Sequence, residues 1–216
     1  MHGDAGRADR MAQRDRAAVH VELLDVDLAD GGVAAQPVGG PHGAGEGVQD
    51  GEGLCGEGLV DLVPVSPGRL NVLTPALGGG PFNVAIAAAR LGADVEFQSR
   101  ISTDGFGQEL FRRLEEEGVE TAHVQRGEEP TTLAVTTIAE NGTASYNFYV
   151  EGTADRFVEP KLAPADIACF GTVSLALEPG ASRYAQLLKD FAAQGTLVAL
   201  DPNIRPFYAT EAHKKF

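Results

Sequence analysis

The sequence predicts an α/β fold in which helices cover a parallel sheet and a small antiparallel sheet stands apart from it. From residue 53 onward, short apolar or β-branched runs alternate with helical patterns, which is typical of a parallel sheet with helices packed on it. Two β-branched and aromatic runs, 131–139 and 143–150, break this alternation and are joined through Asn141-Gly142. That dipeptide is the strongest short signal for a hairpin, because both residues tolerate positive φ. The 216 − 52 = 164 residues after residue 52 suffice to bury about 70% of the surface that the unfolded chain exposes.

The other elements follow in a regular order along the chain. Judged by periodicity, they are strand 59–63, helix 81–91, strand 95–97, helix 107–117, strand 167–170, helix 182–193 and strand 197–200. A glycine closes each helix, namely Gly92, Gly118 and Gly195, as expected for a residue that readily takes the left-handed conformation at a helix end.

Residues 1–52 differ from the rest of the chain in composition. They hold 10 of the 27 glycines and 10 acidic but only 4 basic side chains, with a single apolar stretch near residues 19–28. Without a periodicity that could bury a face, an ordering entropy of about 1 to 2 kcal/mol per residue would go uncompensated. We therefore predict a flexible extension over 1–52 and the N-terminal part of a folded domain over 53–216, with its hairpin near 131–150. Translation from too early a start is the competing interpretation of 1–52.

Charge and composition exclude several classes of function. The formal charge of 17 − 31 = −14 disfavours a nucleic-acid partner, and the longest apolar run, 84–89, is far shorter than the roughly 20 residues of a membrane span. Cys55 and Cys169 are too few for a disulfide framework, no apolar segment of a secretory signal stands near the N-terminus, and the histidines form no zinc motif. We expect a cytoplasmic protein with a small-molecule ligand, and neither a nucleic-acid nor a membrane partner.

One glycine pattern, Gly51 to Gly56, matches the GxGxxG fingerprint of dinucleotide sites. A dinucleotide loop follows a strand and opens a helix, whereas here the predicted strand comes after the glycines. No Gly-Lys-Ser/Thr sequence of a P-loop occurs either. We therefore reject both nucleotide-binding motifs.

The stretch Gly78-Gly-Gly-Pro-Phe-Asn83 is more informative. Its glycines let the main chain approach a ligand closely, and Pro81 is suited to the first turn of a helix, whose free N–H groups attract anions or hydroxyl oxygens. Asn83 adds a donor and an acceptor that suit sugar hydroxyls. A tight strand-to-helix turn with an ordinary polar residue is the alternative.

Asp61 interrupts an apolar strand, and Asp201, Asn203 and Arg205 lie just beyond the end of another. An unpartnered buried carboxylate costs several kcal/mol, so Asp61 either faces solvent or meets a partner. Open α/β sheets bind ligands at the carboxyl ends of their strands, which makes the second group a candidate as well. Turn chemistry and a structural ion pair of Arg205 are the alternatives there.

Taken in series, these motifs resemble the N-terminal half of the ribokinase-like carbohydrate kinases, and most of all the bacterial fructokinases among them. The matching stretches lie in the family's own order between residues 54 and 216, at 56–61, 78–92, 103–107, 148–155 and 201–206. The most specific is the Gly-Gly-Gly-Pro-Phe-Asn block with the Arg90-Leu-Gly92 that follows it.

The resemblance implies a three-layer α/β sandwich with a small β-sheet lid, truncated here at the C-terminus. In the family, ATP with Mg²⁺ phosphorylates a primary hydroxyl of a sugar. The lid would come from the segment after Asp61 and from the Asn141-Gly142 hairpin, and the family often dimerises through it. The sugar-binding residues that the resemblance implies are Asp61, Gly79, Gly80, Asn83 and, near the site, Asn203 and Arg205.

The sequence also departs from the family. The family's catalytic base stands in a Gly-Ala-Gly-Asp run, whereas the only Gly-Ala-Gly here, Gly43 to Gly45, precedes Glu46 and lies before the first strand. We therefore assign no catalytic residue, no metal ligand and no ATP-binding residue in this sequence. Of the family's first strand, only Leu54 and Cys55 are recognisable.

We expect the complete protein to phosphorylate a sugar with ATP and Mg²⁺. Val150 stands where sugar-acid kinases of this family tend to carry Arg, which favours a neutral sugar such as fructose. The 216-residue chain itself is expected to show no turnover, because it lacks the base and the ATP-binding half. The alternatives are a non-enzymatic sugar-binding or regulatory fragment, a nucleoside kinase and a 2-keto-3-deoxygluconate kinase of the same fold.

Overall fold

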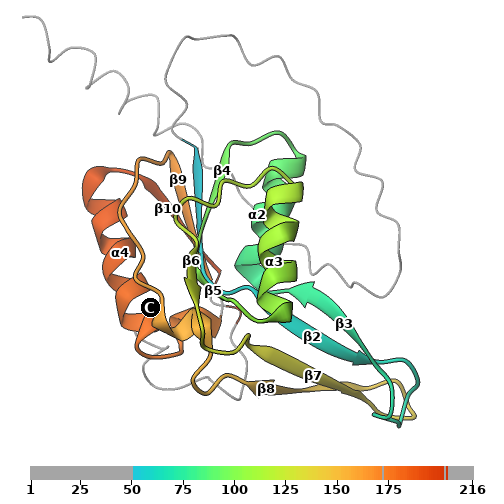
Figure 1. The fold of residues 1–216 in the computed structure, drawn as a ribbon. Coiled ribbons are helices and arrows are strands. Elements are labelled where there is room, and N and C mark those ends of the chain that lie inside the picture. Colours follow the sequence, from blue (N-terminus) through green and yellow to red (C-terminus); the bar gives the residue numbers. More distant parts are fainter. Residues whose placement is uncertain (1–50, 172, 202, 204–216) are drawn as a thin grey trace, which may run out of the picture. The chain divides into compact units, whose positions relative to one another are not determined.

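The computed structural model describes residues 51–171, 173–201 and 203 (Figure 1). The helices are α2 (Gly80–Arg90), α3 (Gly105–Glu116) and α4 (Gly180–Gln194), with two 3₁₀ turns, η1 (Ala154–Phe157) and η2 (Val173–Leu175). The strands are β1 (Glu52–Cys55), β2 (Leu59–Pro64), β3 (Leu73–Gly78), β4 (Val95–Gln98), β5 (Arg100–Ser102), β6 (Gln125–Gly127), β7 (Leu133–Ile138), β8 (Ala144–Tyr149), β9 (Ile167–Gly171) and β10 (Leu197–Asp201). None of the helices described is long and apolar enough to cross a membrane.

The central sheet has the strand order β10-β9-β1-β4, and all of its pairs are parallel. Side chains alternate between its faces, so that neighbouring residues of β1 belong to different hydrophobic clusters. Leu54 joins Phe97 and the helices α2 and α3, whereas Cys55 joins Phe170 and α4. Figure 1 shows α2 and α3 on one side of this sheet and α4 on the other. The predicted three-layer α/β fold is confirmed.

A second sheet with the order β3-β2-β7-β8 forms what we call the lid. It consists of two antiparallel hairpins, β2–β3 and β7–β8, joined by parallel pairing of β2 with β7. The hairpin predicted at Asn141-Gly142 is present, but its turn is not the two-residue type. Gly142 alone has positive φ, at 84°, and its N–H donates to the carbonyl oxygen of Ala139 at 2.8 Å. A wider turn ending in a left-handed glycine therefore closes the hairpin.

Strand 59–63, expected as part of the regular alternation, instead belongs to the lid. The alternation of apolar residues shows that a segment is a strand, but it does not show which sheet the strand joins. β3 escapes prediction because Pro75 interrupts it and most of its side chains are exposed. β5 and β6, a separate two-stranded parallel pair, are too short for a periodic signal.

β1 is also longer than the recognisable Leu54 and Cys55, since Glu52 and Gly53 pair as well. The helices begin and end within two residues of prediction. Gly195 has a φ of 88° and is the C-cap of α4, as expected. The C-cap of α3 is Glu117 rather than Gly118, and that glycine follows with a φ of 76°.

Gly53 allows a prediction about this central strand. A Cβ at this position would meet its nearest atom, the Cβ of Ala165, at 3.8 Å, which is ordinary contact. Gly53→Ala is therefore expected to raise the free energy of unfolding by about 0.5 to 1 kcal/mol, because alanine loses less backbone entropy on folding than glycine. Urea unfolding measures the change. Gly51→Ala is the control, since its Cβ would lie 2.4 Å from the carbonyl oxygen of Asp94 and should destabilise. A loss of stability in Gly53→Ala would contradict the prediction.

Candidate functional site

The turn between β3 and α2 brings together main chain from distant parts of the sequence. Gly79 is the N-cap of α2 with a φ of 108°, and Pro81 follows in the first helical turn. A Cβ on Gly79 would lie 2.5 Å from the carbonyl oxygen of Glu57, so only glycine fits between this turn and the segment after β1. Among the described residues, no side chain caps the helix. Its first N–H groups, including that of Gly80, are therefore open to a hydroxyl or an anion.

Asp61 faces this turn from strand β2. A Cβ on Gly78, where β3 ends, would lie 2.7 Å from Oδ2 of Asp61. The Asp61 side chain is half-buried, and burial raises the pKa of its carboxyl above the usual value. Within the described part of the chain, no hydrogen-bond donor reaches this carboxylate. It is an acceptor beside main-chain donors, an arrangement that suits a hydroxyl group able to donate to one and accept from the other.

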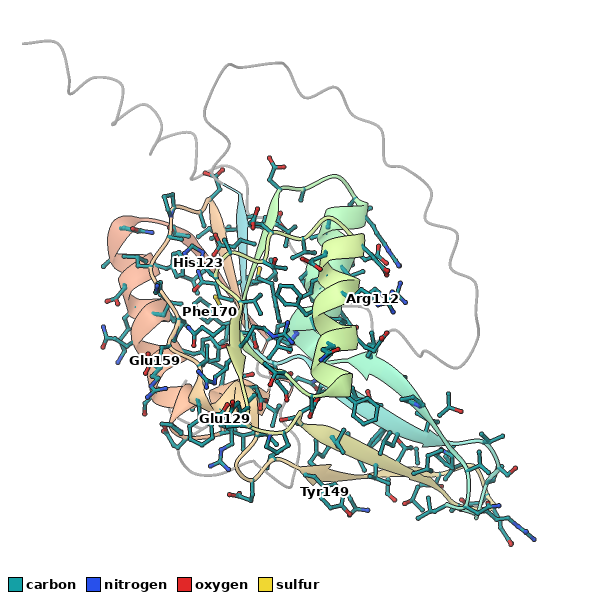
Figure 2. All side chains as sticks on the ribbon, viewed as in Figure 1. Arg112, His123, Glu129, Tyr149, Glu159 and Phe170 are labelled. Carbon is teal, nitrogen blue, oxygen red and sulfur yellow. The ribbon has the colours of Figure 1, made fainter. Side chains whose placement is uncertain are left out.

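The lid places small side chains beside this carboxylate. Asp61 is in register with Ala76 on one side and Ala134 on the other, and Ala134 is in register with Phe148. These four side chains lie on one face, because partners in register share a face of a sheet. The methyl groups of Ala76 and Ala134 therefore flank Asp61, and the ring of Phe148 lies next to Ala134 at the end of this row across the strands. Tyr149, labelled in Figure 2, belongs to the opposite face and is 60% exposed.

Asn83 is placed on the first turn of α2. Its backbone N–H donates to the carbonyl oxygen of Gly79 at 2.9 Å, and its side chain is exposed. The structure therefore groups Asp61, Gly79 and Gly80 around one turn, with Asn83 one helical turn further on.

Asn203 lies just beyond β10, with a left-handed φ of 34°. Its N–H donates to Oδ1 of Asp201 at 3.0 Å, which is the turn chemistry anticipated for this segment. Asp201 is in register with Gly171 at the carboxyl end of β9. A Cβ on Gly56 would lie 2.4 Å from the carbonyl oxygen of Gly171 and 2.2 Å from Pro81, so the end of β9 lies close to the start of α2. Asn203, just beyond the neighbouring β10, therefore lies at the end of the central sheet where α2 begins. Arg205 lies outside the described residues.

Sequence reasoning gave no role to two buried carboxyl groups near the turn. Glu57, 1% exposed, accepts hydrogen bonds from the hydroxyl of Ser174 and, at 3.2 Å, from its N–H. Asp155 is 5% exposed, and burial raises the pKa of its carboxyl, with the charge of Glu57 as a smaller cause in the same direction. No local sequence pattern predicts the burial of Glu57, because its partner Ser174 lies 117 residues further along the chain. In the parts of the chain that are described, no three His, Cys, Asp or Glu side chains are grouped as metal ligands.

Comparison with known proteins places these features in a family. The model of the "pfkB family carbohydrate kinase" matches residues 55–215. A fructokinase of Rhizobium leguminosarum bv. trifolii is 36% identical over 159 residues, which cover 70% of this chain and 48% of the relative. A fructokinase of Escherichia coli is 33% identical over 161 residues, covering 70% and 50%. The chain thus spans about half the length of the curated relatives that it matches.

Solved structures agree with the sequence comparison. A fructokinase of Xylella fastidiosa superposes with a TM-score of 0.67 at 28% identity, covering 76% of this chain and 54% of that one. The same enzyme with bound ATP gives the same TM-score and identity. The resemblance to ribokinase-like kinases drawn from the motifs is confirmed, and the chain belongs to the pfkB family of carbohydrate kinases.

Proposed function

We propose that the complete protein transfers a phosphoryl group from ATP to a hydroxyl of a neutral sugar, fructose first among them. The observation that carries the proposal is the Asp61 carboxylate, which lacks a donor among the described residues and stands beside the open N-terminus of α2. Family membership and the fructokinase relatives support the class of reaction and the substrate. The ATP-bound neighbour supports the phosphoryl donor.

In this proposal, each residue of the site has a distinct task. The Asp61 carboxylate accepts a hydrogen bond from a sugar hydroxyl, and the main chain at Gly79 and Gly80 donates to an adjacent one. Asn83 supplies a further donor and acceptor, and Asn203 and Arg205 complete the site from the end of β10. The ring of Phe148 covers the apolar C–H face of the sugar. Mg²⁺, a cytoplasmic location and a homodimer formed through the lid belong to the proposal for the complete protein.

Val150 supports a neutral sugar over a sugar acid. It follows Phe148 by two residues and lies directly after the end of β8. The nearby guanidinium of Arg156 is engaged, since it donates to the carbonyl oxygen of Val150 at 3.2 Å and to the Glu151 carboxylate at 2.8 Å. A carboxylate on the ligand would therefore meet an apolar side chain at this point.

A coupled assay of ADP release tests the reaction. A polypeptide that continues this reading frame beyond Phe216 is expected to release ADP with ATP, Mg²⁺ and fructose. We expect the 216-residue chain to release none, because it contains no Gly-Ala-Gly-Asp sequence to supply the base, and general-base help is worth about 10² to 10⁴ in rate. Failure of the longer chain with every sugar of a panel would contradict the kinase proposal, and turnover by the 216-residue chain would contradict the proposed inactivity.

Isothermal calorimetry with fructose separates the second candidate, a non-enzymatic sugar-binding or regulatory fragment. The intact turn keeps this candidate open, as does the Asp61 carboxylate, which has no donor in the part of the chain that the structure describes. Binding of fructose without nucleotide by the 216-residue chain, combined with no turnover in the longer chain, would favour it. A panel including a nucleoside and 2-keto-3-deoxygluconate distinguishes the remaining alternatives within the enzyme class.

A further inference from the structure

The two chain segments that connect the β7–β8 hairpin to the rest of the molecule meet at one buried side chain. The chain enters β7 through Thr132 and leaves β8 through Thr153, and Asp155 follows in η1. Oδ1 of Asp155 lies 2.6 Å from the hydroxyl of Thr132 and 2.8 Å from that of Thr153. A backbone hydrogen bond of 3.0 Å from Ala154 to Pro130 joins the same two segments. One carboxyl group therefore ties the entry to the exit of the hairpin.

The hydrogens in this cluster can be counted. The Thr153 hydroxyl also lies 3.0 Å from the carbonyl oxygen of Val150, which can only accept. A hydroxyl carries a single hydrogen, so a full hydrogen bond to Val150 excludes one to Asp155 unless the hydrogen is shared between the two. Both hydroxyls contact the same oxygen, Oδ1, which accepts from both when the carboxyl is ionised. When Oδ1 carries a proton, it can donate to Thr153 and accept from Thr132, and this arrangement leaves the Thr153 hydrogen for Val150.

Burial is the largest influence on the pKa of the Asp155 carboxyl and raises it, whereas the hydrogen bonds from Thr132 and Thr153 act in the opposite direction. The charged carboxylate would face a second acid, Glu57, and the phenol of Tyr184 on α4. The cations on adjacent elements have other partners. Arg100 of β5 pairs with the Glu129 carboxylate at 3.0 Å, and Arg183 of α4 donates to the carbonyl oxygens of Phe157 and Val158. Arg156, next in sequence, donates to main-chain carbonyls and Glu151.

The cluster continues into the proposed sugar site. The carbonyl oxygen of Thr132 accepts a hydrogen bond of 3.0 Å from the N–H of Val60, the residue before Asp61. Two residues after Thr132, Ala134 is in register with Asp61. The position of the Asp61 carboxylate over the glycine turn therefore depends on where Thr132 is held.

We propose that Asp155, as a neutral carboxylic acid, is a positioning residue that fastens both ends of the β7–β8 hairpin and thereby holds Asp61 over the turn at residues 78–80. The consequence for sugar binding rests on the proposed function, whereas the fastening of the hairpin does not. An experiment that needs no sugar can therefore test the fastening by itself.

Amide hydrogen exchange of the 216-residue chain, read by mass spectrometry, is that experiment. In Asp155→Ala we expect the amides of β7 and β8 to exchange about tenfold faster while those of α4 are unchanged. Asp155→Asn, which is neutral and keeps an acceptor and a donor, should stay within about twofold of the parent chain. Asp190→Ala, which loses only a carboxylate that accepts from Gln186 on the surface of α4, is the matched control. Thr132→Val and Thr153→Val remove the hydroxyls without changing the shape, and they replace Asp155→Ala if that variant does not fold.

Three results would overturn the proposal. Equal acceleration in the hairpin and in α4 would mean that Asp155 is merely part of the core. Unchanged amide exchange rates in β7 and β8 of Asp155→Ala, or of both threonine variants, would show that Asp155 does not fasten the hairpin. Acceleration in Asp155→Asn as large as in Asp155→Ala would mean that the charged form is required. Exchange rates as expected, combined with an absence of fructose binding by the polypeptide that continues beyond Phe216, would contradict the proposed function alone.

Urea unfolding at different pH values gives a second readout of the neutral acid. An acid whose folded-state pKa is raised binds more protons folded than unfolded, so it costs stability as the pH rises above its unfolded pKa. The stability of the parent chain is therefore expected to fall relative to Asp155→Asn as the pH rises from about 4, the unfolded pKa of an aspartate, towards neutral. A constant difference between the two chains over this range would contradict a neutral Asp155.

Discussion

Gly79→Ala is expected to lower the free energy of unfolding by about 3 kcal/mol or more, and urea unfolding would show it as a lower midpoint. Two costs add at this position. The φ of 108° is one that L side chains rarely adopt, and such strain costs about 1 to 3 kcal/mol. The added Cβ would also stand 2.5 Å from the oxygen and 3.2 Å from the carbon of the Glu57 carbonyl. These are main-chain atoms, which cannot swing aside as the end of a flexible side chain could.

Gly142→Ala separates the two costs. Gly142 has a comparable φ of 84°, but a Cβ there would meet nothing within 4 Å. Its substitution is expected to cost only about 1 to 2 kcal/mol, the cost of the left-handed conformation alone. Equal losses in the two variants would show that the close approach to Glu57 contributes nothing, which would contradict the described geometry of the turn.

Asp61→Asn is expected to weaken fructose binding about 10- to 100-fold, measured by calorimetry on whichever chain length binds the sugar. A hydrogen bond to a charged acceptor is worth about 1.5 to 3 kcal/mol, and the neutral amide oxygen forms a weaker one. The amide also presents donors to a site that already has them at the start of α2. Asp190→Asn serves as the control, because Asp190 lies on α4, away from the turn.

The same substitution should not weaken the fold. Burial raises the folded-state pKa of Asp61 above its unfolded value, so the ionised carboxylate costs stability as the pH rises above about 4. Asp61→Asn removes that cost and should be at least as stable as the parent chain at neutral pH. Undiminished fructose affinity in Asp61→Asn would exclude Asp61 as a sugar ligand, and a loss of affinity together with lower stability would point to unfolding instead.

Much of the fold could be predicted from local patterns, because its helices carry their own boundary signals. Helix 182–193 and its closing Gly195 needed no tertiary information. β1 was harder, since Gly53 interrupts the apolar signal of a strand that is nevertheless central. Strand 59–63 was recognised as a strand, but its periodicity did not show that it joins the lid, because membership of a sheet is decided by partners that are distant in sequence.

The candidate site could be predicted only in part, for a similar reason. The glycine turn is continuous in sequence, and its three adjacent glycines indicated that other atoms approach the main chain closely there. The position of Asp61 against Gly78 depends on the antiparallel register of β2 with β3, and β3 was not predicted. The burial of Glu57 and Asp155 depends on Ser174, Thr132 and Thr153, whose hydroxyls appear in the sequence as ordinary polar residues.

The pairing of β1 has a consequence for the time course of folding. Glu52 pairs with Val95 and with Ile167, which lie 95 − 52 = 43 and 167 − 52 = 115 residues further along the chain. At a synthesis rate of about 5 to 20 residues per second, the second partner leaves the ribosome about 6 to 23 s after β1 does. During that interval one edge of β1 is unpaired and open to other chains. Gly53, with its weak preference for strands, lowers the tendency of β1 to pair with those chains while it waits.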